Sequence, residues 1–209
     1  YAHSKGYGVN SLNMAIDEGD FTFLIGPTGS GKTTLMRLIY FDIFPDTGLV
    51  KVNGNKSTDV SKRKIPNIRK SIGMVFQDYK LLKDRNLFEN VALPLHVLGY
   101  SNREIPDRVE EALDLVGLVG KEMHYPNELS GGEQQRASLA RAIIKEPDLI
   151  LADEPTGNLD PVASFELVRL LETIHETGTT ILMASHNYNL IKGRGRPIYE
   201  LKDGVLRVR

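Results

Sequence analysis

The sequence predicts an α/β fold with a mostly parallel sheet, and three features of the chain predict it. The apolar run Phe21–Ile25 leads into a glycine-rich loop, and apolar residues at helical spacing follow the loop. From residue 132 to residue 184, strand-like and helix-like segments alternate. Such alternation forms parallel sheets that helices cover on both faces. With 209 residues, 41% of them apolar, the chain can bury the core of one large domain.

The first part of the chain is expected to add short extended elements. Residues 1–17 alternate weakly between apolar and polar, which predicts a β-hairpin. Turn residues on either side of residues 49–52 predict a short strand in a small antiparallel patch. The basic run at residues 62–64 indicates the solvated start of a helix. The apolar run Ile72–Phe76 predicts a buried strand that ends at Gln77.

The rest of the chain is helical at first and then returns to alternation. Residues 86–120 have a helical pattern, in which Ser101 and Glu104 resemble a capping box ahead of an apolar stripe. The elements expected after this stretch are a helix at residues 132–145, a strand at 149–152, a helix at Pro161–Glu176, a strand at 179–184 and a closing hairpin at 198–208.

Composition limits the classes of function. The chain has 26 Lys and Arg against 27 Asp and Glu, and this balance gives no general attraction to nucleic acid, so no nucleic-acid partner is expected. The absence of cysteine excludes disulfides and thiolate chemistry. The sequence contains no apolar run of 18 residues, so we expect no membrane span, and any membrane role requires a partner. Because the chain opens at Tyr1 in what reads as a loop, we expect a first strand to be missing.

The glycine-rich loop carries the nucleotide-binding motif. The residues Gly26-Pro27-Thr28-Gly29-Ser30-Gly31-Lys32-Thr33-Thr34 read GxxxxGK[ST], the P-loop that cradles phosphates. Its glycines let successive N–H groups point at one anion, and the following helix adds its positive end. Lys32 is expected to reach the β- and γ-phosphates, and the hydroxyl of Thr33 to bind Mg²⁺. The alternative is a glycine-rich turn that happens to precede a helix.

Two acids and a histidine follow later strands. The apolar run at residues 149–152 ends in Asp153 and Glu154, whose side chains alternate and can take different roles. Asp153 is expected to bind Mg²⁺, and Glu154 to act as the general base that deprotonates the attacking water. A polar strand end at a turn is the alternative reading of this pair. His186 follows the next strand and is expected to contact the γ-phosphate.

A second glycine-containing helix start makes the family plain. The string Leu129-Ser130-Gly131-Gly132-Glu133-Gln134-Gln135-Arg136 opens a helix and can bind an anion. With this string, the chain resembles the nucleotide-binding subunits of ATP-binding-cassette (ABC) systems. The family's motifs occur here in the family's order, as the Walker A loop at residues 26–34, the Q-loop at Gln77, the signature at 129–134, the Walker B strand at 149–154, the D-loop at 158–160 and the switch His186.

The resemblance implies an ABC-type P-loop ATPase that hydrolyses ATP to ADP and phosphate with Mg²⁺. It implies one domain, with a RecA-like core at about residues 1–85 and 146–209 and a helical subdomain at about 86–145. The catalytic set that it implies is Lys32, Gln77, Glu154 and His186, and the set that binds Mg²⁺ is Thr33, Gln77 and Asp153.

The resemblance also implies a homodimer that forms on ATP binding. ATP would lie between the Walker A loop of one copy and the signature residues of the other, namely Ser130, Gly131, Gly132 and Gln134. The D-loop residues Asn158, Leu159 and Asp160 would lie at the interface between the copies. The aromatic residue that stacks on adenine in this family aligns near Tyr1.

Residues 64–85 and 87–95 narrow the resemblance to the cell-division branch of the family. The discriminating run is Gln-Asp-aromatic-x-Leu-Leu-x-Asp-Arg at residues 77–85. This branch implies a peripheral protein on the cytoplasmic face of the inner membrane, bound near residues 77–82 to an FtsX-type integral membrane partner. ATP turnover would then control cell-wall hydrolysis. Residues 40–44 are bulkier than this branch predicts.

Three alternatives to the cell-division branch differ in kind. The first is the ATPase subunit of a lipoprotein-releasing or macrolide-efflux exporter, which shares the architecture. The second is a soluble ABC ATPase of DNA repair, chromosome organisation or ribosome rescue, but the chain lacks a coiled-coil insertion, zinc-binding cysteines and a tandem cassette. The third is a P-loop kinase, against which the Ser130 signature argues, because a kinase needs no second phosphate clamp.

Overall fold

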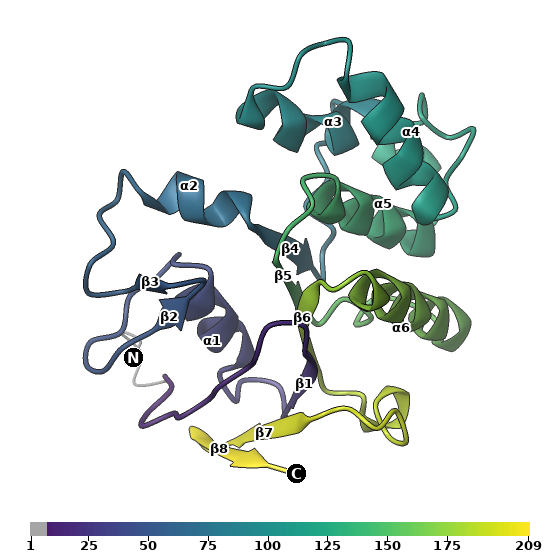
Figure 1. Cartoon of the computed structure of the whole chain (residues 1–209). Helices are drawn as coiled ribbons and strands as arrows, with labels where there is room; N and C mark the ends of the chain where they lie inside the picture. Colours follow the sequence, from purple (N-terminus) through teal and green to yellow (C-terminus); the bar gives the residue numbers. More distant parts are fainter. Residues whose placement is uncertain (1–7) are drawn as a thin grey trace.

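A six-stranded sheet forms the centre of the molecule in the computed structural model, which describes residues 8–209 (Figure 1). The strands lie in the order β4-β5-β6-β1-β7-β8, and all neighbours are parallel except β7 and β8. Their bounds are β1 (Phe21–Ile25), β4 (Ile72–Phe76), β5 (Leu149–Asp153), β6 (Thr180–Ser185), β7 (Ile198–Lys202) and β8 (Val205–Val208). A separate antiparallel pair is formed by β2 (Lys51–Val52) and β3 (Asn55–Lys56).

Helices cover both faces of the sheet because the strand side chains alternate between two apolar clusters. Leu24, Leu151 and Leu182 pack on one face with α1 (Lys32–Ile39) and α2 (Ile65–Lys70). Phe23, Ile150 and other strand residues pack on the opposite face, where the remaining helices lie. These helices are α3 (Leu87–Leu98), α4 (Ile105–Leu115), α5 (Gly131–Ile143) and α6 (Pro161–Glu176), with the short turns η1 (Pro126–Glu128) and η2 (Tyr188–Leu190) nearby in the chain.

The helices α3 and α4 stand away from the sheet, whereas α5 joins them to it (Figure 1). Helix α5 contacts α3 and α4 on one side and β4 and α6 on the other. An asparagine capping box starts α3 at Asn86, and Gly99 ends it in the left-handed conformation. In the part of the chain that the structure describes, no helix is both long and apolar enough to cross a bilayer.

The expected parallel sheet and antiparallel patch are confirmed, and one extended element is not. Strand β4 and helix α6 have the predicted bounds. The hairpin expected in residues 1–17 is wrong for the described part, because residues 9–17 form no strand. Leu12, Met14 and Ile16 turn toward the apolar cluster that includes α1 and α2, so the alternation reports one-sided burial without strand pairing.

Candidate active site

The candidate residues follow four neighbouring strands whose carboxyl ends lie level. Ile25 pairs with Ser185, Ala184 with Asp153, and Asp153 with Phe76. The residue after each of these strands therefore emerges at the same edge of the parallel sheet. These four residues are Gly26, Gln77, Glu154 and His186. The sheet thus gathers at one edge groups that are far apart in the sequence.

The P-loop needs glycine where the backbone passes other chain segments closely. A β-carbon at Gly26 would overlap the carbonyl oxygen of Leu201 in β7. Gly31, the N-cap of α1, has a φ of 106°, and a β-carbon there would lie 2.5 Å from the side chain of the buried Val9. These two positions explain why the turn between β1 and α1 contains glycine.

Lys32 is buried at the bottom of this loop with its charge paired. Its side chain is 4% exposed, and Nζ donates hydrogen bonds to the carbonyl oxygens of Gly26 at 2.7 Å and Pro27 at 3.0 Å. Nζ also lies 2.9 Å from Oε1 of Glu154. A buried ammonium needs such partners, because burying an unpaired charge is strongly unfavourable. Lys32 of the P-loop therefore forms an ion pair with Glu154, which follows β5 far along the chain.

Glu154 lies between this lysine and His186. Its other oxygen, Oε2, contacts Nδ1 of His186. Burial raises the pKa of Glu154, but hydrogen bonds from Lys32 and His186, together with their charges, lower it by more than burial raises it. The pKa of Glu154 therefore lies below its ordinary value. The carboxylate is therefore ionised at neutral pH, as a general base must be. Its backbone has a φ of 49°, and its N–H donates to the carbonyl of Ala184 at 3.1 Å.

Asp153 is more buried than Glu154 and less fully paired. Burial raises the pKa of Asp153, while a hydrogen bond with the Thr33 hydroxyl opposes this effect. Its Oδ1 atom is buried and makes no hydrogen bond within the described part of the chain. A buried oxygen without a donor is unusual and suits a cation or its water ligand. Thr33 and Asp153 thus fit a Mg²⁺ site, since Mg²⁺ takes few protein ligands and keeps waters and phosphate oxygens.

Gln77 contacts the segment that follows β5. Its Nε2 donates to Oδ1 of Asn158 at 3.4 Å, and Nδ2 of Asn158 donates to the carbonyl of Gln77 at 3.0 Å. Gly157 lies directly against this amide, since a β-carbon there would be 2.7 Å from Nε2. The structure therefore brings Gln77 together with the predicted D-loop, and its amide nitrogen points there.

The signature residues start helix α5, on the sheet face opposite to the P-loop helix α1. Ser130 is the N-cap and forms a capping box with Glu133. Gln134 donates from Nε2 to the carbonyl of Leu129 at 3.0 Å. Among the described residues, no hydrogen bond or ion pair joins residues 26–34 to residues 130–134. One copy of the chain therefore carries two separate groups of predicted ATP-binding residues.

Side chains of α5 hold the loop after β4, a feature that the sequence did not predict. Gln135 donates to the carbonyl of Phe76 at 3.2 Å. Arg141 donates to the carbonyls of Tyr79 and Lys80 at 2.9 and 2.7 Å. Both loop residues have positive φ angles, 60° and 51°, which side chains other than glycine seldom adopt. The loop expected to meet a membrane partner is thus fastened to the signature helix.

The other predicted residues fall into three groups. Asp160 caps α6 by accepting from the N–H groups of Val162 and Ala163 at 2.9 and 3.0 Å, and Leu159 packs beside the apolar cluster under α5. Ser30 has a buried hydroxyl without a hydrogen bond in residues 8–209. Tyr1, the expected adenine-stacking residue, lies outside the described residues.

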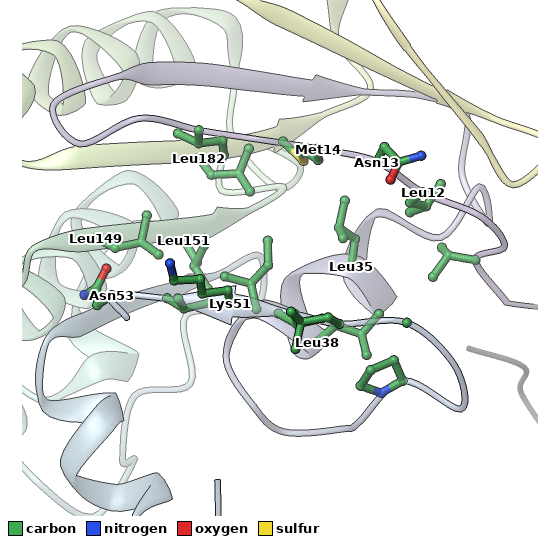
Figure 2. A pocket seen from close by; sticks show the side chains of 18 of the residues that line it. Leu12, Asn13, Met14, Leu35, Leu38, Lys51, Asn53, Leu149, Leu151 and Leu182 are labelled. Carbon is green, nitrogen blue, oxygen red and sulfur yellow. The ribbon is translucent and has the colours of Figure 1, made fainter. Parts of the chain in front are cut away.

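A cavity of about 760 Å³ lies elsewhere, between the sheet, α1 and the segment before β1 (Figure 2). Leucines from the sheet (Leu149, Leu151 and Leu182) and from α1 (Leu35 and Leu38) face it. Within residues 8–209 no histidine lines it, and the P-loop residues 26–34 do not reach it. This hollow has a mixed lining, because leucines on one side face polar residues such as Asn13, Lys51 and Asn53, and it is separate from the candidate active site.

Known proteins share this arrangement along nearly the whole chain. The family model described as ABC transporter matches residues 9–157. The cell division ATP-binding protein FtsE of Escherichia coli K12 is 46% identical over 208 residues, covering 97% of this chain and 94% of the relative. FtsE of Mycobacterium tuberculosis is 45% identical, with 99% and 90% covered, and FtsE of Bacillus subtilis is 42% identical, with 95% and 87% covered.

Solved structures agree with these relatives. A dimeric post-hydrolysis state of the ATP-binding cassette MJ0796, bound to ADP and Pi, superimposes with a TM-score of 0.87 at 36% identity, covering 96% of this chain and 89% of that one. The protein cbiO1 from Clostridium perfringens, part of the ABC transporter complex cbiONQ, gives 0.89 at 29% identity, with 99% and 83% covered. The fold and the order of its elements are therefore those of these cassettes.

Proposed function

The chain belongs to the ABC transporter family, and from this premise we propose that it is the ATP-binding and ATP-hydrolysing subunit of a bacterial cell-division complex. It acts on ATP and water and yields ADP and phosphate. Its identity of 42–46% to FtsE proteins of three distant bacteria, over 95–99% of this chain, is the observation that carries the proposal. The same relatives favour cell division over a lipoprotein-releasing or macrolide-efflux exporter.

The residues at the carboxyl edge of the sheet have distinct roles in this proposal. The N–H groups of the P-loop and Nζ of Lys32 hold the phosphates. Glu154 accepts the proton of the attacking water, since its lowered pKa keeps it ionised. His186, in contact with the carboxylate of Glu154, orients that base and reaches the γ-phosphate. Gln77 reports the γ-phosphate to the D-loop through its two hydrogen bonds with Asn158.

Mg²⁺ would be held by Thr33 and Asp153, with Gln77 as the third protein ligand. When bound, Mg²⁺ supplies positive charge to the transferred phosphoryl group. The unpaired Oδ1 of Asp153 and the neighbouring Thr33 hydroxyl support this assignment. Among the described residues no cluster of three His, Cys, Asp or Glu forms a metal cage, which suits an ion bound mainly through phosphate and water.

A second copy of the chain completes each ATP site in this proposal. The P-loop and the signature start helices on opposite faces of one sheet, so the signature residues that meet ATP come from the other copy. Ser130, Gly131, Gly132 and Gln134 then form the second phosphate clamp, and the D-loop residues 158–160 lie at the interface. ATP joins two positive helix ends, so binding closes the pair and hydrolysis loosens it.

The membrane partner is an integral protein of the FtsX type, and the chain is peripheral on the cytoplasmic face of the inner membrane. The partner docks at residues 77–82 and the helical subdomain, which we place at about residues 86–145. The RecA-like core then comprises about residues 1–85 and 146–209. In support of this division, α3 and α4 contact the rest of the molecule mainly through α5.

A substitution of the general base tests the enzymatic part of the proposal. Glu154→Gln should lower phosphate release at least about a hundredfold, because a positioned base contributes roughly 10²–10⁴. ATP binding should persist, since Gln keeps the shape of the side chain. The matched control is Glu176→Gln, at an exposed helix end remote from the site, which should hydrolyse ATP at the normal rate.

Depletion of the protein in its own bacterium tests the cellular part. Unsplit septa and filaments are expected, with rescue by the wild-type chain and by Glu176→Gln but not by Glu154→Gln. Normal division with mislocalised lipoproteins would instead support the exporter. Normal hydrolysis by Glu154→Gln would contradict the catalytic role whatever the cellular result.

A further inference from the structure

We infer that Lys121 is a positioning residue for the signature clamp: it holds and neutralises Glu133, which would otherwise compete with the phosphate for Ser130. The inference rests on the proposed two-copy ATP site, in which Ser130 meets the γ-phosphate held by the other copy. Lys121 lies in the connection between α4 and η1, outside every motif. It thus adds a group to the clamp that motif spacing does not indicate.

In a single copy, Glu133 occupies the donors of Ser130. Oε2 of Glu133 accepts from the backbone N–H and from the hydroxyl of Ser130, both at 2.8 Å. The N–H of Glu133 in turn donates to Oγ of Ser130 at 3.3 Å. A phosphate oxygen that uses the Ser130 hydroxyl must therefore displace this carboxylate oxygen. In the capping box, the carboxylate of Glu133 therefore takes the place that the phosphate would take in the proposed clamp.

Lys121 holds the second oxygen of the same carboxylate. Its Nζ forms an ion pair with Oε1 of Glu133, whose side chain is only 18% exposed. The hydrogen bond from Lys121 and those from Ser130 lower the pKa of Glu133 to about 2, so this group stays ionised at neutral pH. The carboxylate can release Ser130 without losing its cation, because each oxygen has its own partner.

The charge balance at the start of α5 depends on this pair. A helix N-terminus attracts anions, but an unpaired carboxylate beside it repels a phosphate. With Lys121 present, the pair adds no net charge next to Ser130. Arg136, on the same helix, lies 4.0 Å from Glu166 on α6 and is turned toward that acid. Lys121 is therefore the cation in direct contact with Glu133.

The experiment uses ATP-driven dimerisation of full-length protein carrying Glu154→Gln, followed by light scattering across ATP concentrations. In this parent, adding Lys121→Met should raise the ATP concentration for half-maximal dimer by about three- to tenfold, because a bare carboxylate faces the incoming phosphate. Adding Glu133→Gln as well should restore the parent value, since no charge remains to be neutralised. The defect should shrink at ~0.5 M salt, where charges are screened.

The start of α3 offers a matched control. There Asn86 and Glu89 form the same capping box, and Nη1 of Arg85 lies 3.0 Å from Oε1 of Glu89. This box lies outside the proposed ATP site. Arg85→Met in the same parent should therefore leave the ATP concentration for dimerisation unchanged.

Each outcome decides the matter. An unchanged Lys121→Met variant overturns the inference, and so does a defect that Glu133→Gln fails to rescue, because Lys121 would then act only through packing. An equal defect in Arg85→Met also overturns it. If the parent binds ATP but stays monomeric, the two-copy site fails and the inference fails with it. If the parent does dimerise with ATP, the two-copy site stands, and a negative result with Lys121→Met then counts against the role of Lys121 alone.

Discussion

At Gly26 the P-loop passes β7 so closely that a side chain has no room. A β-carbon would overlap the backbone carbonyl of Leu201, whereas at Gly29 nothing lies within 4 Å of the same position. Gly29 also has a positive φ of 81°, so both glycines carry some conformational requirement. An alanine at Gly29 therefore tests backbone strain alone, whereas an alanine at Gly26 adds steric overlap with β7.

Gly26→Ala should lower the free energy of unfolding by about 3 kcal/mol, because strand β7 must shift to admit the methyl group. Gly29→Ala should lower it by only about 1 kcal/mol, the strain of a left-handed alanine. Urea unfolding of both variants measures the difference. Equal losses would show that β7 gives way easily at Leu201 and would contradict the steric argument.

At the level of single residues, the sequence predicts groups that follow strands better than groups that act from loops. Glu154 and His186 meet because each follows a strand in one parallel sheet, and strand ends are visible in the sequence. Lys32 meets Glu154 from the start of α1, at the end of the loop that follows β1. The S-x-x-E spacing of Ser130 and Glu133 also signals their contact. Lys121 gives no such signal, because its contact with Glu133 depends on the path of an irregular connection. The roles of all these residues remain predictions.

Among the elements, helix α5 has a larger role than its motif suggests. Its N-terminus carries the signature, Gln135 holds the end of β4, and Arg141 holds the loop at Tyr79 and Lys80. A helix is stiff over this length, so the loop and the signature move together. If a membrane partner docks at the loop as proposed, its binding would act on the helix that carries Ser130.

Arg141→Ala should release the loop, because the carbonyls of Tyr79 and Lys80 lose their donors while their strained φ angles remain. We expect amide exchange at residues 78–82 to speed up by about tenfold or more, and stability to fall by about 1–3 kcal/mol. Hydrogen exchange with mass spectrometry and urea unfolding measure these changes.

The control for this variant is Arg108→Ala on α4, which removes a partly exposed ion pair with Glu146 and the contact of the guanidinium with the Tyr100 ring. Its stability loss should stay below about 1 kcal/mol, and exchange at residues 78–82 should not change. Unchanged exchange in Arg141→Ala would show that the loop holds its shape by itself.

The sequence predicts elements well where burial is continuous and poorly where it is one-sided. Strands β1, β4 and β5 are short apolar runs between turns, and such runs have few other solutions in a covered sheet. Residues 9–17 alternate, but alternation shows only that one side faces a core. Pairing needs a neighbouring strand at the right distance, which local pattern does not reveal.

For the whole molecule, the division of the ATP site between two copies has a direct test. Lys32→Ala should inactivate the P-loop half and Ser130→Arg the signature half, so neither variant alone should hydrolyse ATP. A pair made of one copy of each retains one intact composite site. Mixing equal amounts should therefore restore about a quarter of wild-type phosphate release, since half of the pairs are mixed and each has one site of two.

The controls for this experiment are each variant diluted with buffer and each variant mixed with more of itself. Neither control should hydrolyse ATP. Crosslinks between residue 32 of one copy and residue 130 of the other should form only with ATP. If the mixture stays inactive while both variants still bind nucleotide and associate, the site is not shared between copies.

The proposed active site lies at the carboxyl ends of the parallel strands, whereas turns precede the opposite ends of β1 and β6. One of these is the turn at Thr177 and Gly178 between α6 and β6, which is exposed and held by short-range backbone hydrogen bonds. The chain could be opened at this turn and its two termini joined by a linker. The resulting circular permutant would have its motifs in a different order along the chain and the same arrangement of site residues in space. In the proposed site, hydrolysis depends on where the strand ends, the P-loop and the signature helix lie in space, so such a permutant should still hydrolyse ATP although its motifs occur in a different order.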